Sequence, residues 1–145
     1  MSEKIQNNVN DEIGEYEDPT FLIYNNTTNG MKTSEWGSLT WDTLFIYILG
    51  RYPVTYKDNP KLADKYVSWI KNLPDIMPCG ICRQDFQKIL ENTDELDNIS
   101  FYKRSRMHML YYLFLIKEKV NEKLGKVRKE TFLQIIEKYN QNRTF

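Results

Sequence analysis

The apolar residues of this chain recur at helical spacing, and this feature constrains its fold most. In one segment they stand at i, i+3, i+4, i+7 and i+8, which is one helical face: Trp41, Leu44, Phe45, Ile48 and Leu49. Thr33-Ser34-Glu35 is typical of a helix start, and Pro53 lacks the N–H that would continue a helix. We therefore predict a first helix from 33 to about 51.

Three further segments show the same periodicity between the turn-forming residues. A second helix is expected after Pro60 and before Pro74, and a third starts at Pro78. A long fourth helix is expected from Ser100 to about Leu124, where Gly125 closes it. The residues expected to face inward are Leu62, Tyr66, Trp69 and Ile70 on the second helix and Met107, Leu110, Tyr111, Phe114 and Leu115 on the fourth. On the third helix, Cys79, Cys82, Phe86 and Ile89 are expected to line one side.

A short fifth helix would bury Phe132, Ile135 and Ile136. No segment alternates apolar and polar residues in the way that a half-buried strand does. We predict an all-α fold, a four-helix bundle with a short fifth helix.

The first 32 residues differ from the rest in composition. They hold six acidic residues against two basic ones, many Asn and Thr, and one short apolar run, Phe21 to Tyr24. Low hydrophobicity without periodicity is typical of mobile segments. We predict an acidic, flexible tail over 1–32 and one helical domain over 33–145, with the apolar run as a segment that docks on it.

Overall charge and hydrophobicity exclude several classes of protein. Twenty acidic residues balance twenty basic ones, so bulk charge gives no basis for nucleic-acid binding. No apolar stretch is long enough to span a bilayer, and the N-terminus does not resemble a secretion signal. We expect a soluble protein that binds neither nucleic acid nor membrane, with no export signal.

The chain has two cysteines, Cys79 and Cys82, separated by two residues. They react with each other, bind a metal, or stay idle. A thioredoxin-like site requires strands around the motif, which the sequence does not predict. Zinc requires four ligands, and with His108 as the single histidine only a dimer sharing one ion between two cysteine pairs would supply them. We therefore predict no metal site within one chain, and dithiol oxidation as the chemistry.

The two sulfurs are expected to differ in position. Cys79 falls in the first turn of its predicted helix, where free N–H groups and the helix dipole favour a thiolate. Cys82 lies one turn deeper, on the predicted core-facing side. We expect Cys79 to be the accessible sulfur and Cys82 to meet an electron acceptor such as a flavin packed against aromatic side chains.

Three sequence blocks, in order, extend this interpretation. They are Trp36-Gly37-Ser38-Leu39-Thr40-Trp41-Asp42-Thr43-Leu44-Phe45 with the later Tyr52-Pro53, Pro78-Cys79-Gly80-Ile81-Cys82-Arg83 with the later Phe86, and Val120-Asn121-Glu122-Lys123-Leu124-Gly125-Lys126. Together they resemble the W-x-x-L-H, P-C-x-x-C and H-N-x-V-N-x-x-L-G-K motifs of the Erv/ALR family of FAD-linked sulfhydryl oxidases. The resemblance covers about Glu35 to Phe132.

The resemblance implies a function and a set of site residues. It implies a thiol oxidase that forms disulfides in a partner protein and passes the electrons through FAD to dioxygen, giving hydrogen peroxide. Cys79 and Cys82 would be catalytic, with Cys82 next to the flavin and Cys79 facing the incoming dithiol. The residues it assigns to FAD binding are Ser38, Trp41, Phe45, Tyr52, Lys117, Asn121 and Lys126.

The chain departs from the family pattern at three positions. Phe45 replaces a histidine, and Lys117-Glu118 replaces a His-Asn pair. Phe45 would stack on the cofactor and Lys117 would supply positive charge. Divergent viral members are similar in carrying phenylalanine at the first position, which favours a viral origin and a place in the host cytoplasm or the virion.

The absence of further cysteines in this chain bears on its partners. Without a second cysteine pair on the tail, the immediate substrate is expected to be another protein's dithiol, such as a thioredoxin-like carrier. Relatives dimerise through the first two helices, which makes a homodimer through Trp36, Tyr47 or Trp69 the expected assembly. Two alternatives stay open: an inactive helical interaction module that lost the cofactor, and a zinc-linked dimer.

Overall fold

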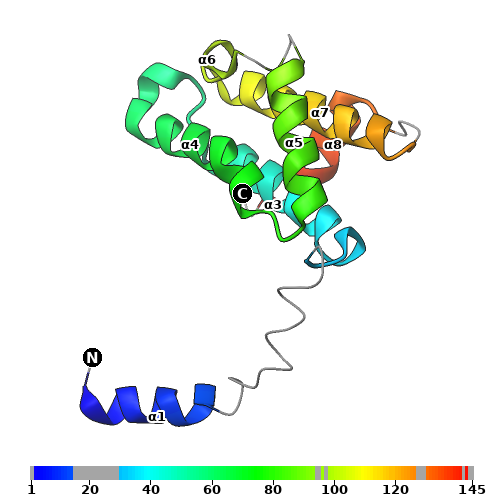
Figure 1. Ribbon diagram of the computed structural model, residues 1–145. Coiled ribbons are helices and arrows are strands. Elements are labelled where there is room, and N and C mark those ends of the chain that lie inside the picture. Colours follow the sequence, from blue (N-terminus) through cyan, green and yellow to red (C-terminus); the bar gives the residue numbers. More distant parts are fainter. Residues whose placement is uncertain are drawn as a thin grey trace.

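The computed structural model describes residues 2–14, 30–93, 96, 98–126, 130–141 and 143, and within them the chain is helical (Figure 1). The helices are α1 (Glu3–Gly14), α3 (Thr33–Arg51), the short 3-10 helix η1 (Tyr56–Asp58), α4 (Pro60–Ile76), α5 (Gly80–Asn92), α6 (Ile99–Tyr102), α7 (Arg106–Lys123) and α8 (Phe132–Asn140). In these residues the only β-type pairings are two isolated bridges, Gly30 with Cys79 and Thr55 with Ser105. The prediction of an all-α fold is confirmed.

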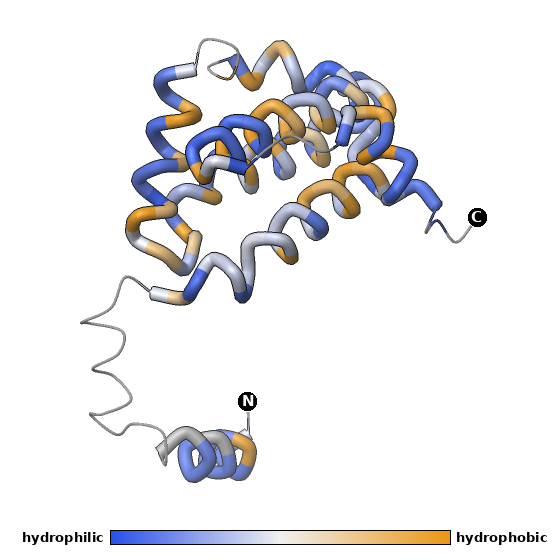
Figure 2. Tube along the Cα trace, turned by 90° about the vertical axis from the view of Figure 1, so that its right-hand side faces the viewer, coloured by the Kyte–Doolittle hydropathy of each residue, from blue (hydrophilic) through white to orange (hydrophobic). Residues whose placement is uncertain are grey.

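The bundle consists of α3, α4, α5 and α7, with α8 as the short fifth helix. Helix α3 contacts α7 and α8, while α5 contacts α4 and α7. Apolar positions concentrate along the faces where the helices meet (Figure 2). Each helix of the described part is too short or too polar to cross a bilayer. The largest fully buried side chains are Leu44, Phe45, Ile48, Tyr52, Ile70, Leu96, Met109, Leu110, Leu113 and Ile116.

Helix α4 begins where predicted but does not stop at Pro74. Asn59 Oδ1 accepts a hydrogen bond from the Leu62 N–H at 3.2 Å, and Pro60 occupies the first helical position. The helix continues through Pro74 to Ile76, so the predicted end is wrong. A proline inside a helix removes one hydrogen bond, and here Pro74 is buried in the core, which offsets that loss.

The face that α4 turns inward also differs in detail from the prediction. Ala63, Val67 and Ile70 are buried, whereas Leu62, with Tyr66 and Trp69, is only half-buried at the edge of the interface. The true face is rotated by about one residue, since the small Ala63 allows the closer approach.

The predicted fourth helix is two helices. A turn at Lys103 and Arg104 separates α6 from α7, and Ser105 Oγ accepts the His108 N–H at 3.0 Å to start α7. Met107 and Tyr111 were expected in the core but are exposed. Leu110 and Phe114 are buried as predicted, and the buried face of α7 is completed by Met109, Tyr112, Leu113 and Ile116.

The predicted N-terminal tail contains a helix that the sequence patterns did not predict. Helix α1 begins after Ser2, whose Oγ accepts the Ile5 N–H at 3.3 Å, and Glu3 lies in its first turn, where the helix dipole favours a negative charge. It was missed because its sequence has few apolar residues to mark a face. Residues 15–29, including the apolar run from Phe21 to Tyr24, lie outside the described residues.

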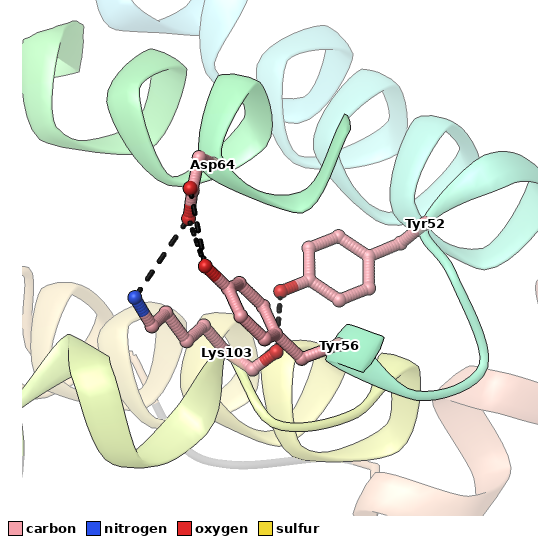
Figure 3. A network of polar contacts seen from close by, with 4 residues as sticks. All are labelled: Tyr52, Tyr56, Asp64 and Lys103. Carbon is pink, nitrogen blue, oxygen red and sulfur yellow. Dashed lines mark hydrogen bonds and ion pairs between the residues drawn. The ribbon is translucent and has the colours of Figure 1, made fainter. Parts of the chain in front are cut away.

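A polar network ties the end of α3 to the turn between α6 and α7 (Figure 3). The buried Tyr52 hydroxyl donates to the Lys103 carbonyl at 2.7 Å. The Tyr56 hydroxyl donates to Asp64 at 3.1 Å, and the Lys103 ammonium lies 3.7 Å from the same carboxylate. Burial, with a smaller effect of Asp64, raises the pKa of Tyr52, so its hydroxyl stays a neutral donor.

We expect Tyr52→Phe to lower the free energy of unfolding by about 1–2 kcal/mol, because the Lys103 carbonyl loses its donor in a buried place. Urea denaturation followed by circular dichroism measures this difference. Tyr47→Phe removes the same hydroxyl from an exposed ring on α3 and serves as the control. Equal stabilities for the two variants would contradict the role given to the Tyr52 hydroxyl.

Candidate active site

The two cysteines form a disulfide at the start of α5. Their Cα atoms are 5.2 Å apart. Cys79 is the N-cap residue in extended backbone conformation, and its Sγ accepts the Cys82 N–H at 3.2 Å. A sulfur at this position faces the unpaired N–H groups and the positive end of the helix dipole, which stabilise a thiolate once the bond is reduced. The pair therefore has the geometry of a dithiol that switches between two redox states.

The two sulfurs have different surroundings. Cys79 is 5% exposed, whereas Cys82 is half-buried and borders a pocket. The Thr33 hydroxyl lies 3.4 Å from Cys82 Sγ. The prediction that Cys79 is the more accessible cysteine is wrong, because Cys79 is the more buried of the two and Gly30 lies against its backbone.

The pocket beside Cys82 lies at one end of the bundle, where α3 and α5 begin and α7 ends. Most of its lining is apolar or aromatic, and two indole rings contribute to it. Its charged residues are Asp85 and Lys123, which form an ion pair of 2.7 Å. The lining consists of Thr33, Trp36, Gly37, Thr40, Trp41, Leu44, Met77, Cys82, Asp85, Phe86, Ile89, Val120, Lys123 and Leu124. Such a pocket suits a planar aromatic group held against the sulfur.

Several residues assigned to the site by sequence lie at this end of the bundle. Trp41 lines the pocket together with Cys82. Ser38 is exposed on α3, next to the pocket residue Gly37. Asn121 follows the pocket residue Val120, and its carbonyl accepts the Lys126 N–H at 2.9 Å. The structure thus gathers Trp41 and Cys82 directly, with Ser38, Asn121 and Lys126 on the adjoining turns.

Phe45 and Tyr52 do not line the pocket, and both are fully buried. Phe45 stacks on Tyr139 of α8, with ring centroids 5.5 Å apart and an interplanar angle of 11°. Tyr52 lies at the far end of α3 in the polar network described above. Contacts of Phe45 and Tyr52 with a cofactor stay a prediction, because both side chains are packed in the hydrophobic core.

Lys117 lies close to Phe45, with its ammonium 5.9 Å from the ring centroid. Burial lowers the pKa of Lys117, and the negative charges of Glu130 and Asp42 offset this only in part. Asp42 accepts a hydrogen bond of 2.5 Å from the Tyr139 hydroxyl. Burial, followed by this bond, raises the pKa of Tyr139. A partly desolvated ammonium is a position where an anionic group would be stabilising.

Sequence reasoning missed several lining residues. Thr33 was noted only as part of a helix start, and Trp36 as part of a family motif and as a surface for dimerisation, without a place in the cofactor site. Thr33, Trp36, Thr40 and Leu44 recur at spacings of three and four residues, so they share a helix face. That spacing was a usable signal. Lys123 was not identifiable alone, since its place depends on how α7 packs.

Comparisons with known proteins agree with this geometry. The sequence profile described as the Erv1 / Alr family matches residues 38–140. An FAD-linked sulfhydryl oxidase of African swine fever virus, from a tick isolate from Malawi, is 29% identical over 94 residues, which cover 63% of this chain and 69% of the relative. The FAD-linked sulfhydryl oxidase of a pig isolate from Kenya is 28% identical over the same shares.

We expect Thr33→Val to move the half-maximal pH for alkylation of reduced Cys82 upward, by a few tenths of a unit, because the hydroxyl within 3.4 Å of the sulfur no longer stabilises a thiolate. Iodoacetamide labelling followed by peptide mass spectrometry measures it. Thr43→Val is the matched control, because its hydroxyl bonds only the Leu39 carbonyl of the same helix. An unchanged profile in Thr33→Val would remove Thr33 from the site.

Proposed function

Because the chain belongs to the Erv1/Alr family, we propose that it is an FAD-linked sulfhydryl oxidase that forms disulfides in partner proteins. The observation that carries the proposal is the disulfide whose Cys82 sulfur borders an apolar pocket walled by Trp36 and Trp41. FAD, when bound, supplies a two-electron acceptor beside this sulfur and a route from there to dioxygen, which becomes hydrogen peroxide.

The residues around the pocket fit this cofactor. Trp36 and Trp41 offer indole surface to a planar ring, and Cys82 places a sulfur at the same wall. Lys126 is exposed at the end of α7, where its ammonium is available to a phosphate. Lys117 adds a second, partly desolvated cation. Both lysines would hold the phosphates, while the apolar walls exclude water from the sulfur.

The cysteines perform the thiol chemistry in two exchanges. A substrate thiolate attacks Cys79 Sγ, the Cys79–Cys82 bond breaks, and Cys82 leaves as a thiolate. The second substrate thiolate then attacks the substrate sulfur of the mixed disulfide, and Cys79 leaves as a thiolate. The substrate loses two electrons and two protons and gains a disulfide, while the cysteine pair gains the two electrons. The Thr33 hydroxyl supports the thiolate on Cys82.

We assign another protein's dithiol as the substrate, with a thioredoxin-like carrier as the expected form. The chain contains two cysteines, and both belong to the active-site pair. No cysteine of this chain is left to relay electrons. The two viral relatives support a viral origin, with action in the host cytoplasm or the virion.

A homodimer through α3 and α4 is the assembly we propose. Leu39, Ile46 and Tyr47 are exposed on α3, and the Tyr47 ring lies 5.6 Å from Trp69 of α4. Exposed apolar side chains gathered on two adjacent helices are typical of a surface that another protein covers.

The oxidase proposal predicts a yellow protein that consumes oxygen in the presence of dithiothreitol. We expect flavin absorbance that denaturation releases, and Cys82→Ser to abolish oxygen uptake, since the acceptor then has no sulfur beside it. Oxygen electrode measurements and absorbance spectra test both. Unchanged uptake in Cys82→Ser would refute the relay. Colourless protein with stoichiometric zinc would identify the zinc-linked dimer, and colourless protein without metal the inactive module.

Lys117→Met is expected to stabilise the flavin-free protein and to weaken flavin retention. Burial lowers the pKa of Lys117 in the folded state. At neutral pH the folded protein therefore holds a charged ammonium whose desolvation lowers the stability, and methionine removes that charge. The gain from the substitution should vanish as pH rises through the range of an unfolded lysine, about 10.4. Thermal melts of flavin-free protein and flavin dissociation by dialysis measure the two effects. Lys88→Met, on the exposed face of α5, is the control. A destabilised flavin-free variant would contradict this account.

A further inference from the structure

The residues just before α3 lie across the start of α5. The Met31 N–H donates to the Pro78 carbonyl at 2.6 Å, and Gly30 forms an isolated antiparallel bridge with Cys79. The two segments are far apart in sequence. Gly30–Met31, called the Gly30–Met31 strand below, is a two-residue segment bridged to the backbone edge that leads into the active-site disulfide.

Glycine is required for this approach. Gly30 has φ +109°, and a Cβ built there would lie 2.3 Å from the Pro78 oxygen. Any other residue would have to move the strand away. The close contact between Gly30 and the Pro78 carbonyl therefore requires glycine at position 30.

The Gly30–Met31 strand lies against the backbone of Cys79, a residue that is 5% exposed. Thiol–disulfide exchange nevertheless requires a thiolate to reach one sulfur of the pair. The Cys82 sulfur faces the pocket, so an incoming protein thiol has to reach Cys79. The Gly30–Met31 strand must move for that approach.

We propose that the Pro78–Cys79 backbone edge is the docking surface for an extended, cysteine-bearing segment of the substrate, and that Gly30–Met31 holds this place until the substrate displaces it. The inference rests on the proposed oxidase function and adds how the substrate is recognised. The Met31 bond shows that the Pro78 carbonyl accepts a hydrogen bond from the backbone of a second segment, as it would from a substrate backbone.

The side chains around the edge fit an apolar partner segment. Ile76 at the end of α4 and Ile81 in the first turn of α5 are 62% and 59% exposed, and both stand within three residues of Pro78. Met31, which bonds to Pro78 itself, is 60% exposed. A substrate strand with apolar residues next to its cysteine would bury them, while its backbone replaces the bond that Met31 makes.

The hydrogen bonds of the resting strand are ones that a substrate backbone can replace in part. The Met31 N–H donates to the Pro78 carbonyl, and the Trp36 indole N–H donates to the Met31 carbonyl at 3.0 Å. Each bond is worth about 0.5–1.5 kcal/mol net. A substrate N–H that donates to the Pro78 carbonyl would replace the Met31 bond with an equivalent one.

The first test measures how far the strand protects Cys79. In the reduced protein, we expect Gly30→Ala to raise the rate of Cys79 alkylation by iodoacetamide about two- to twelve-fold. This range is the change in the equilibrium between covered and open Cys79 that follows from the loss of one hydrogen bond. Cys82 alkylation should not change. Gly50→Ala, in α3 with open space around its Cα, is the matched control. Met31→Pro removes the donor N–H and should give the same result.

Unchanged Cys79 alkylation in both variants would overturn the proposal. An equal rise at Cys82 would also overturn it, because it would mean a general loosening of the site. Neither readout requires flavin, oxygen or turnover, so these results stand apart from the test of oxidase function.

The second test measures the docking itself. In Cys82→Ser, a ten-residue peptide with one activated cysteine is trapped on Cys79 as a mixed disulfide, and amide hydrogen exchange at Met31 is measured by NMR. We expect Met31 to lose protection in the peptide adduct and to keep it in the adduct with 2-mercaptoethanol, which has no backbone. Equal Met31 protection in the two adducts would refute strand exchange.

Discussion

The antiparallel contact between α3 and α7 is the interaction on which the rest of the structure depends. Its apolar seam includes Phe45 and Ile48 from α3 and Leu110 and Leu113 from α7, all with 0% exposure. Burial of a side chain of this size contributes about 1.5–3 kcal/mol. Since the helices run in opposite directions, the start of α3 meets the end of α7. The pocket forms there, beyond the seam, where Trp36 and Trp41 face Val120 and Leu124.

The packing of the helices, and not the Cys-x-x-Cys motif itself, determines where the active-site disulfide lies. Helix α5 packs on both α4 and α7, which brings its first turn to the mouth of the pocket. Cys82 then borders the pocket, while Cys79, as N-cap, lies outside it. One helical turn thus separates Cys82, which borders the pocket, from Cys79, whose backbone pairs with another segment.

Local patterns predicted the parts of this structure that local interactions determine. The start and end of α3, the Asn59-Pro60 start of α4 and the Cys-x-x-Cys pair were readable because caps, prolines and helical spacing act within a few residues. The continuation of α4 through Pro74, the stacking of Phe45 on Tyr139 and the burial of Cys79 were not. Each depends on a partner distant in sequence, and no periodicity within the segment carries that information.

The start of α3 connects the two sides of the disulfide through one side chain. Trp36 lines the pocket, and its indole N–H holds the Met31 carbonyl of the strand that covers Cys79. One turn earlier, the Thr33 hydroxyl contacts Cys82. A displacement of Met31 therefore releases a hydrogen bond from the same ring that forms the pocket wall. Access to Cys79 and the shape of the pocket beside Cys82 are coupled because both depend on Trp36.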